Sequence, residues 1–81
     1  MEPLERKILE QLAKAREHRE TNLNLKTIWA ECGSVDPQAF VQAWGALDAG
    51  ELVHGELFIS DASVDGLGKI TAKGEELLRK S

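Results

Sequence analysis

The chain has 81 residues, of which 42% are hydrophobic and 30% are charged, and its formal net charge is −4 at pH 7. This length predicts one domain over residues 1–81 with a small core, and the composition argues against disorder. No apolar run approaches the roughly 18 residues that a membrane span needs, and the N-terminus has no pattern of a signal peptide. The one cysteine, Cys32, excludes an internal disulfide. We therefore expect a cytoplasmic protein with no membrane partner.

The charges are distributed unevenly along the chain. Residues 1–20 carry as many basic as acidic side chains, and residues 69–81 are net basic. Between Thr27 and Gly68 there is no lysine or arginine, although seven acidic residues occur there: Glu31, Asp36, Asp48, Glu51, Glu56, Asp61 and Asp65. We therefore expect a basic partner to contact the middle of the chain.

The first predicted element is an amphipathic helix. It begins near Pro3, because proline suits the first helical turn. Thr21 and Asn22 favour the turn that follows it. The apolar face of this helix is expected to comprise Leu4, Ile8, Leu9, Leu12 and Ala15.

Two further helices are predicted between residues 24 and 50. Asn24 is a good N-cap for the second helix, and Gly33 is expected to end it. Asp36 and Pro37 suit the start of the third helix, which should reach about residue 49, where Gly50 stops it. The expected buried residues are Leu25, Ile28, Trp29 and Cys32 in the second helix, and Phe40, Trp44 and Leu47, with Val41 at the margin, in the third.

The hydrophobic period then changes to that of strands. Residues 52–59 predict a strand in which Gly55 could mark a bulge. Residues 61–68 have the composition of a turn, and residues 69–71 predict a short returning strand. Thr71 is expected to cap a last helix over residues 72–80, whose Leu77 and Leu78 return to the core.

Two segments resemble the winged-helix superfamily in its small bacterial or phage form. Residues 46–53, Ala-Leu-Asp-Ala-Gly-Glu-Leu-Val, resemble the "Leu-x-x-Gly" junction between the recognition helix and the wing. Residues 70–78, Ile-Thr-Ala-Lys-Gly-Glu-Glu-Leu-Leu, resemble the "Ile-Thr-x-x-Gly-x-x-x-Leu" closing segment of many bacterial winged-helix regulators. The resemblance implies an α+β, mostly helical fold. It consists of a three-helix helix-turn-helix core, a β-hairpin wing and a short C-terminal helix.

In that superfamily the third helix usually enters the DNA major groove, and the wing lies along the backbone. Carried onto this chain, this use implies that Gln38 and Gln42 contact base edges, since glutamine can pair with adenine through two hydrogen bonds. The basic side chains that could then contact phosphates are Lys14, Arg16, Arg19, Lys26, Lys69 and Lys73. The pattern favours a different interpretation of these cations, a solvated rim in which they are mixed with acidic side chains.

The charge pattern favours contact with a protein over contact with DNA. Phosphate contacts need cations, and the expected wing tip carries Asp61 and Asp65, which phosphates repel. The expected outer face of the third helix is uncharged and small, which lets another helix or strand approach closely. An ordinary solvated helix surface stays the open alternative. The predicted partner-binding residues are Gln38, Gln42, Gly45, Ala46, Ala49, Asp61 and Asp65.

No pattern of residues predicts catalysis. His18, Cys32 and His54 are far apart and lack metal-ligand spacing, and Gly66 and Gly68 do not precede a helix as in a phosphate-binding loop. We therefore expect no enzyme, no metal and no small-molecule cofactor. The sequence predicts a non-enzymatic binding module that contacts another protein or a second copy of itself, with DNA mimicry as one form of this. The alternative is a small DNA-binding transcriptional regulator.

Overall fold

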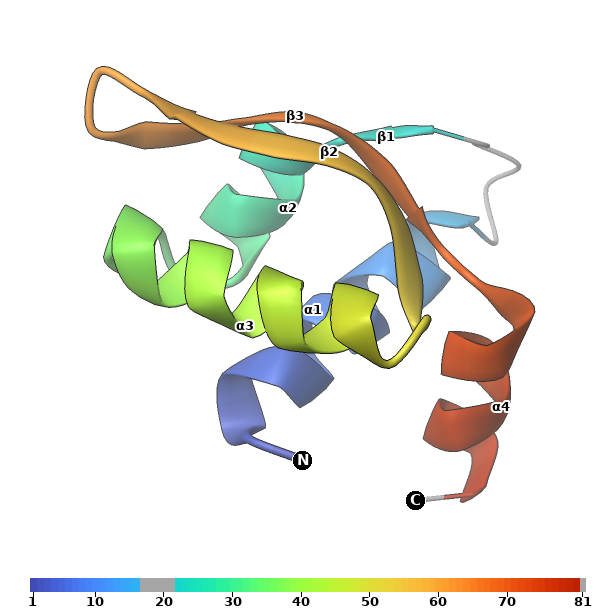
Figure 1. Ribbon diagram of the computed structural model, residues 1–81. Coiled ribbons are helices and arrows are strands. Elements are labelled where there is room, and N and C mark those ends of the chain that lie inside the picture. Colours follow the sequence, from blue (N-terminus) through green and yellow to red (C-terminus); the bar gives the residue numbers. More distant parts are fainter. Residues whose placement is uncertain (17–21, 81) are drawn as a thin grey trace.

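The computed structural model describes residues 1–16 and 22–80 and has an α+β, mostly helical fold (Figure 1). The described residues form four helices and one three-stranded antiparallel sheet, so the predicted fold class is confirmed at this level. None of these helices has the length and apolar character needed to cross a membrane. The elements are α1 (Pro3–Arg16), β1 (Leu23–Asn24), α2 (Leu25–Glu31), α3 (Pro37–Ala49), β2 (Val53–Ser60), β3 (Ser63–Ile70) and α4 (Ala72–Lys80).

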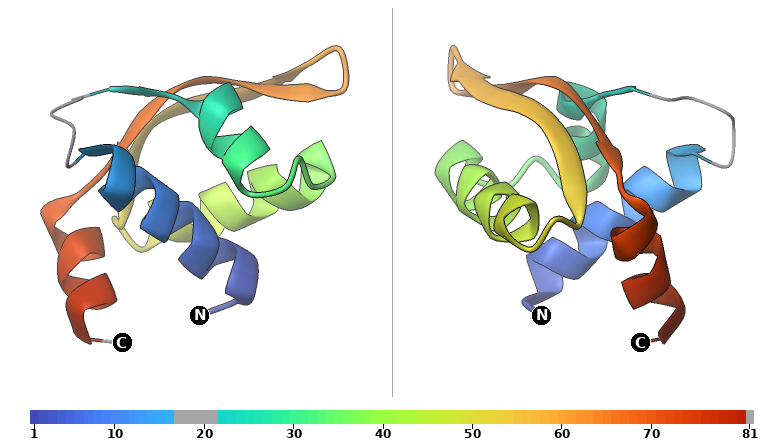
Figure 2. Two further views of the ribbon diagram at one scale, coloured as in Figure 1. Left: turned by 180° about the vertical axis from the view of Figure 1, so that it is seen from behind. Right: turned by 45° about the vertical axis from the view of Figure 1, so that its right-hand side comes forward.

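The sheet covers α2 and α3, while α1 crosses on their far side and α4 follows the base of the β2–β3 hairpin (Figures 1 and 2). The strand order is β1-β3-β2, which makes β3 central and β2 an edge strand. The sequence did not predict β1. Its two residues pair with β3, Leu23 opposite Gly68 and Asn24 opposite Leu67. So short a strand has no periodicity of its own and is defined only by its partner.

The core lies between the helices and the inner face of the sheet, the face that β3 turns toward α2. The predicted burial of Leu25, Ile28 and Cys32 is confirmed, whereas Trp29 is only half-buried and donates its indole N–H to the Val35 carbonyl oxygen at 2.7 Å. In α1, Leu4 and Ala15 are half-buried at the margin. The largest fully buried side chains are Phe40, Ile8, Leu9, Leu12, Leu25, Leu47, Ile70 and Val64.

The predicted start of α2 is confirmed, because the Asn24 side chain accepts a hydrogen bond of 2.9 Å from the Lys26 backbone N–H. Thr71 caps α4 in the same way, accepting from the Gly74 N–H at 3.1 Å, and its hydroxyl donates to the Glu51 carbonyl at 2.7 Å. Asp36 precedes α3 but makes no side-chain cap bond. Proline at the first position of α3 supplies the start signal there instead.

Both α2 and α3 end in the same hydrogen-bonded motif, but with different residues in the left-handed position. Gly33 occupies it after α2 with φ of +91°. After α3 the left-handed residue is Glu51, with φ of +61°, because Gly50 still has φ of −87°. The Leu52 N–H closes this end by donating to the Leu47 carbonyl at 2.9 Å. Gly50 is therefore the C-cap residue of α3, and the left-handed residue is the next one, Glu51.

The predicted turn over residues 61–68 and the three-residue return strand are wrong. The turn contains only Asp61 and Ala62, both with positive φ, and Ser63 already pairs with Ser60. Gly66 and Gly68 have residue types typical of a turn, but they lie inside β3. Gly66 has φ of +123°, which side chains rarely adopt, and a Cβ there would overlap the Glu56 carbonyl oxygen.

Gly55 does not mark a bulge, which corrects a second prediction. The register from Val53 opposite Ile70 to Ser60 opposite Ser63 is continuous, with no extra residue in either strand. Gly55 has φ of +142°, and a Cβ there would overlap the Leu67 carbonyl oxygen. Glycine therefore allows a backbone conformation here that a side chain would exclude, and the pairing is not broken.

Two glycines, one packed against α3 and one exposed on it, are expected to respond to alanine substitution with opposite effects on stability. A Cβ at Gly68 would lie 2.8 Å from Trp44 Cη2, whereas a Cβ at Gly45 would meet nothing within 4 Å. We expect Gly68→Ala to destabilise the fold by about 1–3 kcal/mol through overpacking. Gly45→Ala, on the exposed helix, should stabilise it by about 0.5–1 kcal/mol.

Thermal or urea unfolding of both variants measures these changes. In thermal unfolding, each kcal/mol shifts Tm by about 4–8 °C for a domain of this size. Equal Tm values for Gly68→Ala and wild type would contradict the close packing of Trp44 on β3.

Candidate interaction surface

Five of the predicted partner-binding residues lie on the exposed side of α3. These are Gln38, Gln42, Gly45, Ala46 and Ala49, and all five are exposed. The opposite side of the helix is apolar and buried, as the helical period requires. We call these five residues the α3 strip.

The residues along α3 differ in how close they lie to the hairpin. Trp44 points at the sheet, where its ring meets Gly68. Ala46 follows two residues later and is therefore turned by about 200° around the helix axis, away from the sheet. Asp48 lies on the side toward β2, because it lines a recess together with Val53 and His54. Gly45, three residues before Asp48, borders the same side.

The two predicted acidic residues of the hairpin have different positions. Asp61 is the first residue of the turn and is exposed. Asp65 is not at the tip: it lies within β3 opposite Phe58, is half-buried, and its Oδ1 accepts from the Gly66 N–H at 2.9 Å. Asp65 is away from the tip because the turn has only two residues, so that residues 63–68 belong to β3.

The hairpin also exposes apolar side chains that the sequence analysis missed. Phe58 and Leu67 are 54% and 58% exposed, and Ile59 is 38% exposed. Leu67 is opposite Glu56, and Phe58 is two residues further along β2, so Phe58 and Leu67 are diagonal neighbours on the outer face of the sheet. A signal was present, since consecutive Leu57, Phe58 and Ile59 cannot all face inward from one strand.

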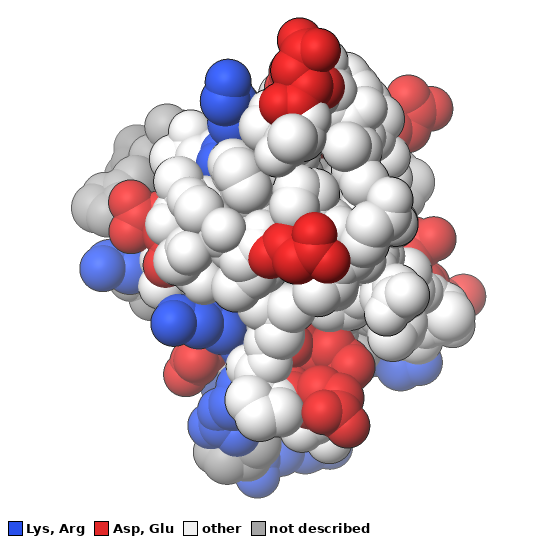
Figure 3. All heavy atoms as spheres, turned by 90° about the vertical axis from the view of Figure 1, so that its left-hand side faces the viewer, with Lys and Arg blue, Asp and Glu red and all other residues white. Residues whose placement is uncertain are grey.

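The basic residues considered for phosphate contact do not gather on this surface. Lys69 is exposed near the base of the hairpin, and Lys73 pairs with Glu51 at 4.0 Å. Lys14 and Lys26 are exposed on α1 and α2, Arg16 is the last residue of α1, and Arg19 lies outside the described residues. Viewed toward the hairpin tip, the central surface is uncharged apart from separate acidic groups, and blue side chains lie at the upper left, along the margins and at the lower end (Figure 3).

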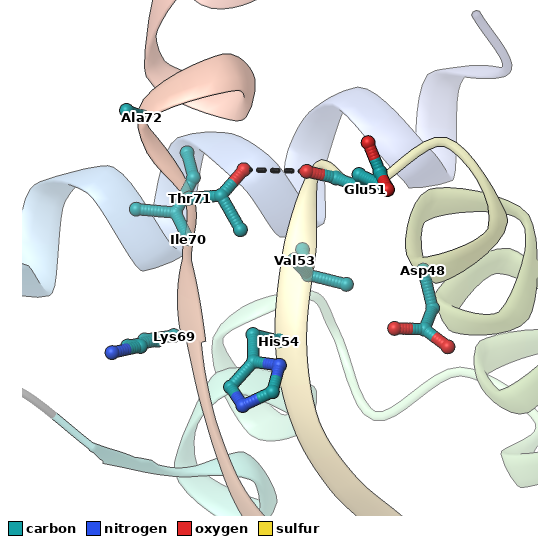
Figure 4. A pocket seen from close by; sticks show the side chains of 8 residues that line it. All are labelled: Asp48, Glu51, Val53, His54, Lys69, Ile70, Thr71 and Ala72. Atoms are coloured by element: carbon teal, nitrogen blue, oxygen red, sulfur yellow. Dashed lines mark hydrogen bonds between the residues drawn. The ribbon is translucent and has the colours of Figure 1, made fainter.

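An open recess of about 530 Å³ lies at the base of the hairpin (Figure 4). Asp48 comes from α3, His54 from β2 and Lys69 from β3. Thr71, which follows β3, donates a hydrogen bond from its hydroxyl to the carbonyl of Glu51, which precedes β2. The carboxylates of Asp48 and Glu51 and the imidazole of His54 lie around one opening, but they do not converge on a point. In the part of the chain that the structure describes, no three His, Cys, Asp or Glu side chains are arranged to hold a metal ion.

Comparison with known proteins gives no match: no family model, no curated protein and no solved structure is similar to this chain at a significant level.

The Cys32 thiol is buried in the core rather than placed at this surface. Burial raises its pKa above the ordinary value of 9.0, Lys7 lowers it, and Glu31 raises it. The folded protein therefore favours the neutral thiol. The stability from this preference is fully present below pH 9.0 and is lost as the pH rises through the higher pKa of the folded state.

We accordingly expect Cys32 to resist thiol reagents in the native protein and to react on unfolding. Cys32→Ser should lower the free energy of unfolding by about 1–3 kcal/mol, because it buries a hydroxyl without a ready partner. Labelling in native buffer and in urea, followed by mass spectrometry, measures the protection. Rapid labelling under native conditions would show that the face of α2 carrying Cys32 is open.

Proposed function

We propose that this protein is a non-enzymatic binding module with a winged-helix fold, which contacts another protein through the hairpin and the α3 strip. The order of three helices, a hairpin and a last short helix supports the fold. The Thr71 cap and the close packing of Gly74 against Leu52 support the assignment of residues 70–78 to the closing segment of that family. The buried free thiol suits a reducing cytoplasm.

The main support for contact with a protein is the chemistry of the outer face of the hairpin. Phe58 and Leu67 are exposed there beside the carboxylates of Glu56 and Asp65. Exposed apolar side chains in one patch are typical of protein contact sites, because burying them against a partner removes apolar surface from water. Carboxylates at the same place repel phosphates, which makes the surface unsuited to DNA.

The alternative function, a DNA-binding regulator, draws its support from α3. Gln38 and Gln42 are both exposed and lie one helical turn apart, so they can reach neighbouring base edges. Between Thr27 and Gly68, however, no lysine or arginine is present to hold the helix against a phosphate backbone. The two functions therefore differ in the nucleic-acid affinity that they require.

We expect duplex DNA to bind no more tightly than roughly 10⁻⁴–10⁻⁶ M at physiological salt, the range of non-specific contacts. A gel-shift or fluorescence-anisotropy titration against mixed duplexes measures this affinity. Sub-micromolar, sequence-dependent binding that is lost in Gln38→Ala or Gln42→Ala would favour the regulator instead.

Protein binding is tested by immobilising the full chain and passing a lysate of the source cells over it. We expect a specific protein to be retained by the wild type and lost both in the Phe58→Ser, Leu67→Ser double variant and in Ala46→Arg. Ala30→Arg is the matched control for Ala46→Arg, because Ala30 is also exposed on a helix but lies on α2. Equal retention by all four proteins would contradict the proposed surface.

A further inference from the structure

The strand β2 has an open backbone edge. The Thr71 N–H donates to the Leu52 carbonyl at 3.0 Å, and Leu52 and Thr71 continue the register of the hairpin by one pair. Hydrogen-bonded pairs alternate along an antiparallel ladder, so the even-numbered residues of β2 bond to β3. The backbone groups of Gly55, Leu57 and Ile59 consequently point away from β3. Among the described strands, none lies on that side of β2.

Several features that often protect an edge strand are missing from β2. The eight residues of β2 include no proline and no lysine, and their register has no bulge. Leu57 is half-buried, while Phe58 and Ile59 are exposed. An open edge of this length with apolar side chains is a template for pairing with another extended chain.

Carboxylates lie on and near this edge, although Glu56 is the one acidic residue within β2 itself. Glu56 lies in the middle of β2, Asp65 lies beside Phe58 on the outer face, and Asp61 lies in the turn. Within residues 1–16 and 22–80, no ion pair involves any of these three carboxylates. Charge complementarity therefore favours a basic occupant. A second copy of this chain paired at this edge would bring the same three carboxylates toward their own copies, and like charges repel.

We propose that the open edge of β2 accepts an extended basic segment of a partner protein as a fourth strand of the sheet. This inference rests on the proposed function, and it specifies the partner's chemistry. The segment alternates Lys or Arg with apolar residues. Its basic side chains lie on the outer face opposite Glu56 and beside the Phe58 ring, where a cation is also attracted to the aromatic face. Its apolar side chains lie on the inner face opposite Leu57 and Ile59, and their backbone groups bond to those two residues.

The probe is an acetylated, amidated heptapeptide of alternating lysine and valine, titrated into the ¹⁵N-labelled full chain. We expect the amide signals of Gly55, Leu57 and Ile59 to shift most. The affinity should fall as NaCl rises from about 0.05 M to about 0.3 M, because the attraction is electrostatic. A peptide N-methylated at its valines loses the donors that face β2 and should bind at least about tenfold more weakly. A peptide with glutamate in place of lysine should not bind.

Two variants of the protein locate the site. Ile59→Pro removes an outward-facing N–H without removing a bond to β3, a position at which an edge strand tolerates proline. It should abolish peptide binding while the amide spectrum stays that of a folded chain. Glu56→Lys should weaken binding about threefold to tenfold, and Glu31→Lys, which changes the net charge equally but lies on α2, should not do so beyond a small uniform effect.

The proposal is overturned if the lysine–valine peptide fails to shift the three edge amides, or if the N-methylated peptide binds equally well. A concentration-dependent dimer in light scattering that is lost in Ile59→Pro and strengthens with salt would also overturn it, since the occupant would then be a second copy. Loss of the lysate partner in Phe58→Ser, Leu67→Ser but not in Ile59→Pro would refute strand addition and leave the proposed function standing.

Discussion

The contact between the Trp44 ring and Gly68 sets how closely α3 approaches the sheet. The indole can lie against β3 because residue 68 has no side chain, and a Cβ there would come within 2.8 Å of the ring. Gly68 is also the residue opposite both Leu23 of β1 and Gly55 of β2, so all three strands meet where α3 packs. With Trp44 held there, the uncharged strip of α3 faces solvent and Asp48 borders β2.

The hairpin combines features that a monomeric surface rarely shows together. Its outer face exposes two large apolar side chains, and its outer strand leaves a row of backbone groups unpaired by any described strand. Carboxylates surround both features, and no cation occurs between residues 27 and 68. The apolar groups favour burial, the open backbone favours an extended partner, and the charges select a basic one. Each feature alone is common, and their combination is the basis for the proposed basic, extended partner.

Local signals in the sequence were sufficient for the helices. Asn24, Gly33 and Thr71 act at single positions through their own hydrogen bonds or backbone freedom, so their roles follow from residue type. The sheet was predicted less well because its features depend on distant residues. Gly66 and Gly68 have the composition of a turn, yet they are strand residues whose neighbours across the hairpin and on α3 leave no room for a side chain. The exposure of Leu67 could not be predicted before its strand was known.

The most direct test of the account is amide hydrogen exchange along β2 in the free protein. If the edge is open, the Gly55, Leu57 and Ile59 amides exchange much faster than those of Glu56 and Phe58, which bond to β3. An alternating pattern of fast and slow exchange is therefore predicted. Uniformly slow exchange along β2 in the monomer would show that the edge is already covered, and the hairpin could not then receive a partner strand.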